Sequence, residues 1–204
     1  MEKILKIKNA IPEAEEIYNN ILNTQYDWWF HAIRYGGNKP EFLRYSLHSR
    51  KERDNVESKL KASLAAEHFT YRYTRNMGHK ALCDCYMCNL IPQVLSDKFS
   101  SMFGPVKLDE IFISIYEPGD FLSLHHDQTK GTAFSWNLTK DWKREYGGSL
   151  HIEVEEEHTV VIEPHFNELC IFNIGDDFLN HYVSEVSSFA LTNRIAIVGW
   201  FYPL

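Results

Sequence analysis

Two histidines and an aspartate lie together in an apolar and aromatic stretch, FLSLHHDQ, which spans residues 121–128. In an extended chain alternate side chains share a face, so His125 and Asp127 point one way and His126 points the other. An imidazole nitrogen and a carboxylate oxygen on one face are two of the three ligands of a non-haem Fe(II) site, and the third would be a distant histidine. A solvated strand end can carry the same pattern, so the rest of the chain has to supply the third ligand.

Four later histidines are candidates for that ligand: His151, His158, His165 and His181. Only His181 follows an apolar strand and a short loop and then precedes another strand, RIAIVGWFY, which begins with Arg194. An unpaired cation would be costly to bury in so apolar a strand. The sequence therefore favours His181 as the third ligand and points to a role for Arg194 near it, whereas His165 is expected in an exposed turn.

With these residues in place, the C-terminal half resembles the prolyl-hydroxylase type of Fe(II)/2-oxoglutarate-dependent oxygenase. Order, spacing and flanking hydrophobicity agree over about 100 residues, while the first hundred residues match only in general character. The motifs that carry the resemblance are Tyr116-Glu-Pro-Gly119, His125-His-Asp127, Gly147-Gly148-Ser-Leu150, IEPHFNELCIF from Ile162, HYVSEV from His181 and RIAIVGWFY from Arg194.

The resemblance implies that His125, Asp127 and His181 bind Fe(II) and that 2-oxoglutarate chelates the iron, with O2 as oxidant and ascorbate in support. The activity implied is hydroxylation of an unactivated C–H bond with decarboxylation of 2-oxoglutarate to succinate. Related halogenases have a small residue at the carboxylate position, so Asp127 favours hydroxylation. The competing class is a catalytically silent binding module of the same fold.

The co-substrate residues also follow from the resemblance. The far carboxylate of 2-oxoglutarate needs a buried cation, and the planar guanidinium of Arg194 can pair with it through two hydrogen bonds. The phenol of Tyr116 would donate to the same carboxylate. Asn137, on the next strand, is expected to touch the chelating end.

The substrate implied is of amino-acid type: a prolyl residue of a peptide or protein, or a free amino acid or other small metabolite. Strand 68–76, which carries Arg72 and Arg75, is a candidate to line the substrate site, as is Trp136; the strand can equally be structural. The sequence predicts no oligomeric state.

The periodicity predicts an α+β, mainly β protein, with residues 1–204 as a single oxygenase domain. Residues 1–105 are expected to be mainly helical, with helices over 13–22, 50–66 and 91–103 and one strand over 68–76. The many short strands expected over residues 106–204 suggest a sandwich or a barrel. The resemblance makes that sandwich a double-stranded β-helix, a jelly roll, supported by the N-terminal helices.

Composition excludes some classes of function. The 28 acidic residues outnumber the 21 basic ones, for a formal charge of −7, which argues against nucleic acid as a partner. No window is apolar enough for a membrane span and no secretory signal is visible, so we expect no membrane partner and a cytoplasmic protein.

Three of the four cysteines crowd into six positions, a poor framework for disulfides that suits a reducing compartment. With His79, the thiols of Cys83, Cys85 and Cys88 are sufficient ligands for a tetrahedral structural zinc. The alternative is that some are packed thiols, which behave as small apolar side chains. Both interpretations stay open.

Overall fold

The computed structural model describes residues 3–23, 28–36, 39–47, 68–76, 86–127, 131–155, 158–172 and 179–204, with side chains described outside residues 24–88. In chain order the elements are β1 (Ile4–Lys8), α1 (Ala14–Asn23), β2 (Trp28–Gly36), β3 (Lys39–Leu47), β4 (His68–Asn76), α3 (Tyr86–Phe103), β5 (Val106–Tyr116), β6 (Phe121–His125), β7 (Thr132–Asn137), η2 (Arg144–Tyr146), β8 (Leu150–Glu155), β9 (His158–Ile162), β10 (Glu168–Phe172), β11 (His181–Val183) and β12 (Arg194–Pro203).

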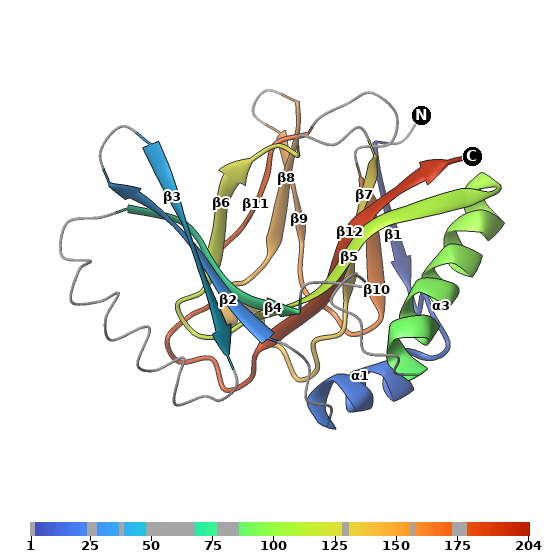
Figure 1. The fold of residues 1–204 in the computed structure, drawn as a ribbon, viewed down its shortest axis with the longest axis horizontal. Helices are drawn as coiled ribbons and strands as arrows, with labels where there is room; N and C mark the ends of the chain where they lie inside the picture. Colours follow the sequence, from blue (N-terminus) through green and yellow to red (C-terminus); the bar gives the residue numbers. More distant parts are fainter. Residues whose placement is uncertain are drawn as a thin grey trace.

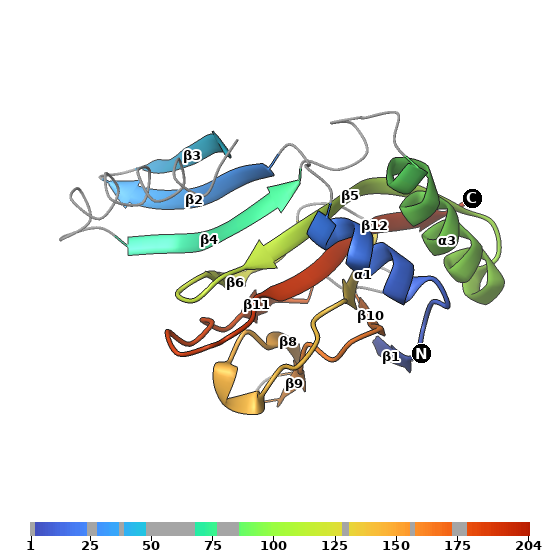
Figure 2. The same ribbon diagram turned by 90° about the horizontal axis from the view of Figure 1, so that it is seen from below.

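The strands form two layers joined at β4. One layer has the order β1-β10-β7-β12-β5 and the other the order β6-β11-β8-β9. β4 pairs with both β5 and β6, so the hydrogen-bonded sheet turns back on itself there, and β2 and β3 extend it beyond β4. Figure 2 shows the two helices on one side of the first layer and β8, β9 and β11 on the other. This is the predicted double-stranded β-helix, mainly β with supporting helices.

Alternation along the strands gives the first layer two buried faces. On β5, Ile111 and Ile113 pack in a core that also contains residues of α1 and α3, whereas Phe112 and Tyr116 pack against residues of the second layer. This follows from the period of two in an extended chain, because a strand covered on both faces must be apolar on both. The inner space between the layers therefore receives only alternate residues of each strand.

Both described helices present an apolar stripe to the sheet. In α1 the buried residues Ile17 and Ile21 are four positions apart, which places them on one face of the helix. Glu15 and Glu16 lie in the first turn, where their negative charge interacts favourably with the positive end of the helix dipole. In α3 the fully buried residues Leu95 and Phe99 have the same spacing. Figure 1 shows α3 running alongside the first layer, with α1 across one end.

Three predicted elements of the N-terminal part are confirmed. The helix expected over 13–22 is α1, the strand over 68–76 is β4, and the helix over 91–103 is the C-terminal part of α3. The longer α3 contains Pro92, which can donate no backbone hydrogen bond. The helix expected over 50–66 lies outside the described residues.

The prediction of a mainly helical N-terminal part with one strand is wrong for the described residues, since β1, β2 and β3 are also strands. β2 and β3 pair in antiparallel register from Trp28 with Leu47 to Gly36 with Lys39. The signal was present as a glycine-rich turn sequence, GGN, between two segments rich in aromatic residues. Within the described part of the chain, neither helix is long and apolar enough to cross a membrane.

Candidate metal centre

The histidine and aspartate side chains predicted to be ligands converge at one end of the space between the layers. His125, the last residue of β6, is directly opposite His181, the first residue of β11, in the antiparallel register, and their ring centroids are 4.3 Å apart. Asp127 Oδ1 lies 3.9 Å from His125 Nε2 and 3.8 Å from His181 Nε2. One ligand atom from each of the three residues lies within 4.8 Å of the others, so a single ion can contact all three.

Both imidazole rings are oriented by backbone carbonyls. His125 Nδ1 lies 2.9 Å from the carbonyl of Ser123, and His181 Nδ1 lies 3.0 Å from the carbonyl of Leu179. A carbonyl can only accept, so each Nδ1 carries the proton and donates, which leaves the lone pair of each Nε2 free for a metal. In both cases the carbonyl belongs to the residue two positions earlier, so the strand that supplies the ligand also orients it.

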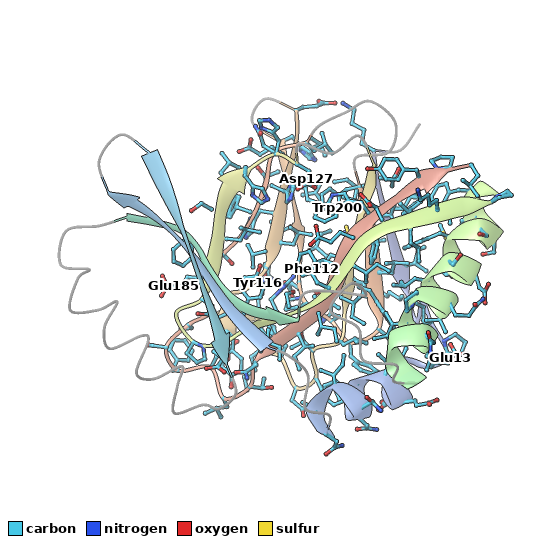
Figure 3. All side chains as sticks on the ribbon, viewed as in Figure 1. Glu13, Phe112, Tyr116, Asp127, Glu185 and Trp200 are labelled. Carbon is cyan, nitrogen blue, oxygen red and sulfur yellow. The ribbon has the colours of Figure 1, made fainter. Side chains whose placement is uncertain are left out.

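The aspartate is oriented by a residue that the sequence did not single out. Trp200 Nε1 donates to Asp127 Oδ2 at 2.9 Å, so the other oxygen, Oδ1, faces the imidazoles. Figure 3 shows Asp127 and Trp200 close together, with Tyr116 deeper between the layers. The available signal was alternation along β12, which puts Trp200 on the same face as Arg194.

Burial keeps His181 in the neutral form that can bind a metal cation. Desolvation, followed by the proximity of His125, lowers the pKa of His181. A lowered pKa keeps the imidazole neutral, and only the neutral ring can be a ligand. The side chain of His181 is 7% exposed and that of Asp127 10%, whereas His125 is 35% exposed, so solvent reaches the cluster from the β6 side. Two neutral imidazoles and one carboxylate with an open side fit a non-haem ferrous ion.

Arg194 lies at the other end of the same space. It is 2% exposed and directly opposite Tyr116 in the register between β12 and β5, with its Cζ 4.9 Å from the centre of the phenol ring. Burial lowers the pKa of Arg194. Among the described residues no carboxylate forms an ion pair with it, and a buried cation left in this way is costly. An anionic ligand between the layers would supply the missing charge.

Asn137 lies beside this guanidinium, and its expected contact with the chelating end of 2-oxoglutarate stays a prediction. Arg194 Nη2 donates to Asn137 Oδ1 at 3.4 Å. The reason is the register, because Asn137 pairs with Ala196, only two residues from Arg194 on β12. Asn137 therefore lies at the guanidinium end of the inner space.

Trp136 does not line the site, contrary to the prediction. Its side chain is fully buried in the core under the helices, and its Nε1 donates to Asn167 Oδ1 at 3.1 Å. Because Asn137 faces the inner space, its neighbour on the same strand must face the helices.

For several other predicted site residues the structure describes only the backbone, and some lie outside the described residues. Arg72 pairs with Phe121 and Arg75 with Ser114, which brings β4 alongside β6 and β5, but the arginine side chains are not described. Their substrate role stays a prediction. The proposed zinc ligands His79, Cys83 and Cys85 lie outside the described residues, and Cys88 is placed in α3 by its backbone alone.

The comparisons with known proteins agree with this geometry. Residues 111–202 match the 2OG-Fe(II) oxygenase superfamily, a stretch that begins in β5 and ends in β12. A stretch of 95 residues is 36% identical to prolyl 3-hydroxylase OGFOD1 of Mus musculus. That stretch is 43% of this chain and 17% of the mouse protein, so the chain corresponds to a small part of that relative.

Solved structures share the fold. A prolyl-4-hydroxylase of Pseudomonas putida superposes with a TM-score of 0.59 at 13% identity, covering 100% of this chain and 94% of the other. A prolyl hydroxylase from Trichoplax adhaerens, solved with a peptide of hypoxia inducible factor, gives 0.52 at 15% identity over 93% and 88%. At such identities the likeness concerns the fold alone. Residues 111–202 are thus similar to the 2OG-Fe(II) oxygenase superfamily, and the curated relative that the chain matches is a prolyl hydroxylase.

Proposed function

We propose that this protein is an Fe(II)- and 2-oxoglutarate-dependent hydroxylase that acts on a prolyl residue of a peptide or protein. The observation that carries the proposal is the convergence of His125, Asp127 and His181, whose ligand atoms lie within 4.8 Å of one another although His181 is 54 positions from Asp127 in sequence. In both histidines Nδ1 donates to a backbone carbonyl, which leaves each Nε2 free for the iron.

The residues at both ends of the inner space support the choice of co-substrate. The three ligands would hold the iron on one face, and Arg194 with Tyr116 would bind the distal carboxylate of 2-oxoglutarate. When bound, iron and 2-oxoglutarate together supply the oxidising chemistry that activates O2 toward an unactivated C–H bond. The chain contributes charge, orientation and an apolar surrounding, including Phe112 and Phe172, that keeps water away.

The relative exposure of the ligands indicates how a substrate reaches the metal. His125 is the most exposed of the three predicted ligands, so the open side of the centre faces β6 and its neighbour in the sheet, β4. A peptide is favoured over a free amino acid because the relatives named above are prolyl hydroxylases, one of them solved with a peptide. A small metabolite is the alternative substrate that the test must include.

The proposal is tested by succinate formation from 2-oxoglutarate with Fe(II), ascorbate and O2. Proline-containing peptides and free amino acids are offered in parallel, and products are screened by mass spectrometry for a gain of one oxygen atom. The His125→Ala variant should lose turnover, and the matched control His126→Ala should keep it because His126 is exposed and faces away from the centre.

Three results would count against the proposal. Equal and negligible turnover in wild type and His125→Ala, across both substrate panels, would favour a silent binding module. Hydroxylation of free amino acids alone would replace the prolyl substrate with a small metabolite. Loss of activity in His126→Ala and retention in His125→Ala would contradict the assignment of the ligands.

A further inference from the structure

Three buried polar atoms between the layers lack a hydrogen-bond partner within the described part of the protein: Ser135 Oγ, Asn137 Nδ2 and Arg194 Nε. The residues that carry them are 3%, 1% and 2% exposed, so bulk water does not serve them. Buried polar groups are almost always paired, because leaving one unpaired costs free energy. A cluster of three such atoms at one place calls for a physical explanation.

Two of these atoms lie at the guanidinium end described above, and the third extends the cluster toward the predicted metal ligands. Ser135 is two residues before Asn137 on β7, so both side chains face the inner space. In the register with β12, Asn137 is opposite Ala196, Ser135 is opposite Val198, and Ala133 is opposite Trp200.

Ser135 therefore lies between the two ends of the proposed site. Trp200 holds the metal-binding Asp127, and Asn137 contacts the guanidinium of Arg194. A ligand that reaches from the guanidinium to the metal has to pass the level of Ser135. Rotation about the Cα–Cβ bond of a serine moves its hydroxyl between staggered positions, so the group can turn toward such a ligand.

A second serine in the same space shows what an ordinary structural hydroxyl does there. Ser114 is 2% exposed on the neighbouring β5, and its Oγ donates to the carbonyl of Ala196 at 3.2 Å. That hydroxyl is satisfied by the fold alone. Ser135 is equally buried but has no such acceptor among the described residues, so the fold does not account for its hydroxyl.

We propose that Ser135 is a co-substrate-binding residue whose hydroxyl donates a hydrogen bond to bound 2-oxoglutarate. The inference rests on the proposed function, since it concerns the same site, and it assigns a role that neither the sequence motifs nor the metal ligands required. The proposal predicts opposite effects of one substitution on the stability of the ligand-free protein and on its affinity for 2-oxoglutarate. Removing the hydroxyl should stabilise the protein without ligand, because an unpaired buried group is lost, and should weaken 2-oxoglutarate binding.

The experiment compares Ser135→Ala with Ser114→Ala in the Mn(II)-loaded full chain. The dissociation constant of 2-oxoglutarate is measured by calorimetry and the melting temperature without ligand by circular dichroism. Ser135→Ala is expected to raise the dissociation constant about tenfold and the melting temperature by roughly 2–4 °C. Ser114→Ala is expected to leave the dissociation constant within about twofold and to lower the melting temperature, since it removes a made hydrogen bond.

A second variant keeps the test decisive if Ser135→Ala folds poorly. Ser135→Cys retains a side chain of similar shape but only a weak donor, so it should bind 2-oxoglutarate about as weakly as the alanine variant. Unchanged affinity in both Ser135 variants, with wild type binding normally, overturns the role of Ser135 and leaves the proposed function standing. Wild type that binds Mn(II) but no 2-oxoglutarate overturns both.

Discussion

Trp200 Nε1 donates to Asp127 Oδ2 at 2.9 Å, and this hydrogen bond decides which carboxylate oxygen faces the two imidazoles. The two residues are 73 positions apart, on a loop after β6 and near the end of β12. The candidate metal centre thus depends on the packing of the first layer as well as on the short motif that contains two of its predicted ligands.

Replacing Trp200 by Phe keeps an aromatic side chain and removes the donor. Loss of such an outer hydrogen bond typically costs 10- to 100-fold in metal affinity, so we expect Mn(II) to bind about tenfold more weakly. Trp136→Phe is the matched control, because it also removes an indole hydrogen bond, to Asn167, but lies in the core under the helices. Calorimetric titration should show unchanged Mn(II) affinity there, and equal losses in both variants would contradict the role of Trp200.

Arg194→Lys retains the positive charge and loses the planar, two-pronged donor. We expect the dissociation constant of 2-oxoglutarate to rise tenfold or more, with Mn(II) affinity unchanged because the guanidinium lies at the opposite end of the inner space from Asp127. Arg144→Lys, at an exposed arginine paired with Glu163, serves as the control. Full affinity for 2-oxoglutarate in Arg194→Lys would show that the anion is bound elsewhere.

Gly199→Ala should destabilise the fold. A Cβ at this position would overlap the carbonyl oxygen of Glu110, where β12 and β5 change register. Overpacking against backbone costs about 1–3 kcal/mol, which corresponds to a fall in melting temperature of roughly 2–12 °C for a chain of this size. At Gly104 an added Cβ would have open space, although φ is +80°. The melting temperature of Gly104→Ala should therefore fall less than that of Gly199→Ala. Thermal melts of the two variants rank these costs, and a larger loss at Gly104 would contradict the argument.

Cys170 should be inert in the folded protein. It is fully buried, and burial raises its pKa from 9.0 to about 12. Because the folded pKa exceeds the unfolded one, the stability that this thiol contributes is complete below pH 9 and is lost as the pH rises from 9 toward 12. Peptide mapping after iodoacetamide treatment at pH 8 should find Cys170 unmodified in native protein and modified after unfolding.

The alkaline limb of stability gives an independent measurement on the same thiol. Cys170→Ala removes the titrating group, so its free energy of unfolding should fall less steeply between pH 9 and pH 12 than that of wild type. Identical slopes in the two proteins would mean that other groups, such as tyrosines, account for the alkaline loss.

Much of the C-terminal half could be predicted because its signals are local. Turn sequences separate short runs of β-branched and aromatic residues there, and β5, β7, β8, β9, β10 and β12 all lie within residues 106–204, where short strands were predicted. The three candidate ligands and Arg194 could be singled out because each occupies a fixed place in an ordered set of motifs, and the structure brings His125, Asp127 and His181 close together as expected.

The residues 1–105 were harder to predict because pairing of strands is not a local property. β1 is a strand of five residues whose partner within the described part of the chain is β10, more than 150 positions away, and nothing near it in sequence indicates that partner. The same limit applies to Asn137 and Trp136. Alternation requires these neighbours to face opposite ways, but only the pairing with β12 decided which of them faces the inner space between the layers.

Residue type and spacing along this chain were enough to identify a His-x-Asp motif, a distant histidine and a buried arginine. Coordination chemistry limits which side chains can bind a metal ion, and the cost of burying a charge limits where an arginine can lie without a partner. Tertiary structure alone revealed the hydrogen bonds of Trp200 to Asp127 and of Arg194 to Asn137, and a Ser135 hydroxyl that has no hydrogen-bond partner among the described residues. These are relations between strands distant in sequence, and such contacts exist only once the sheet register has brought the strands together.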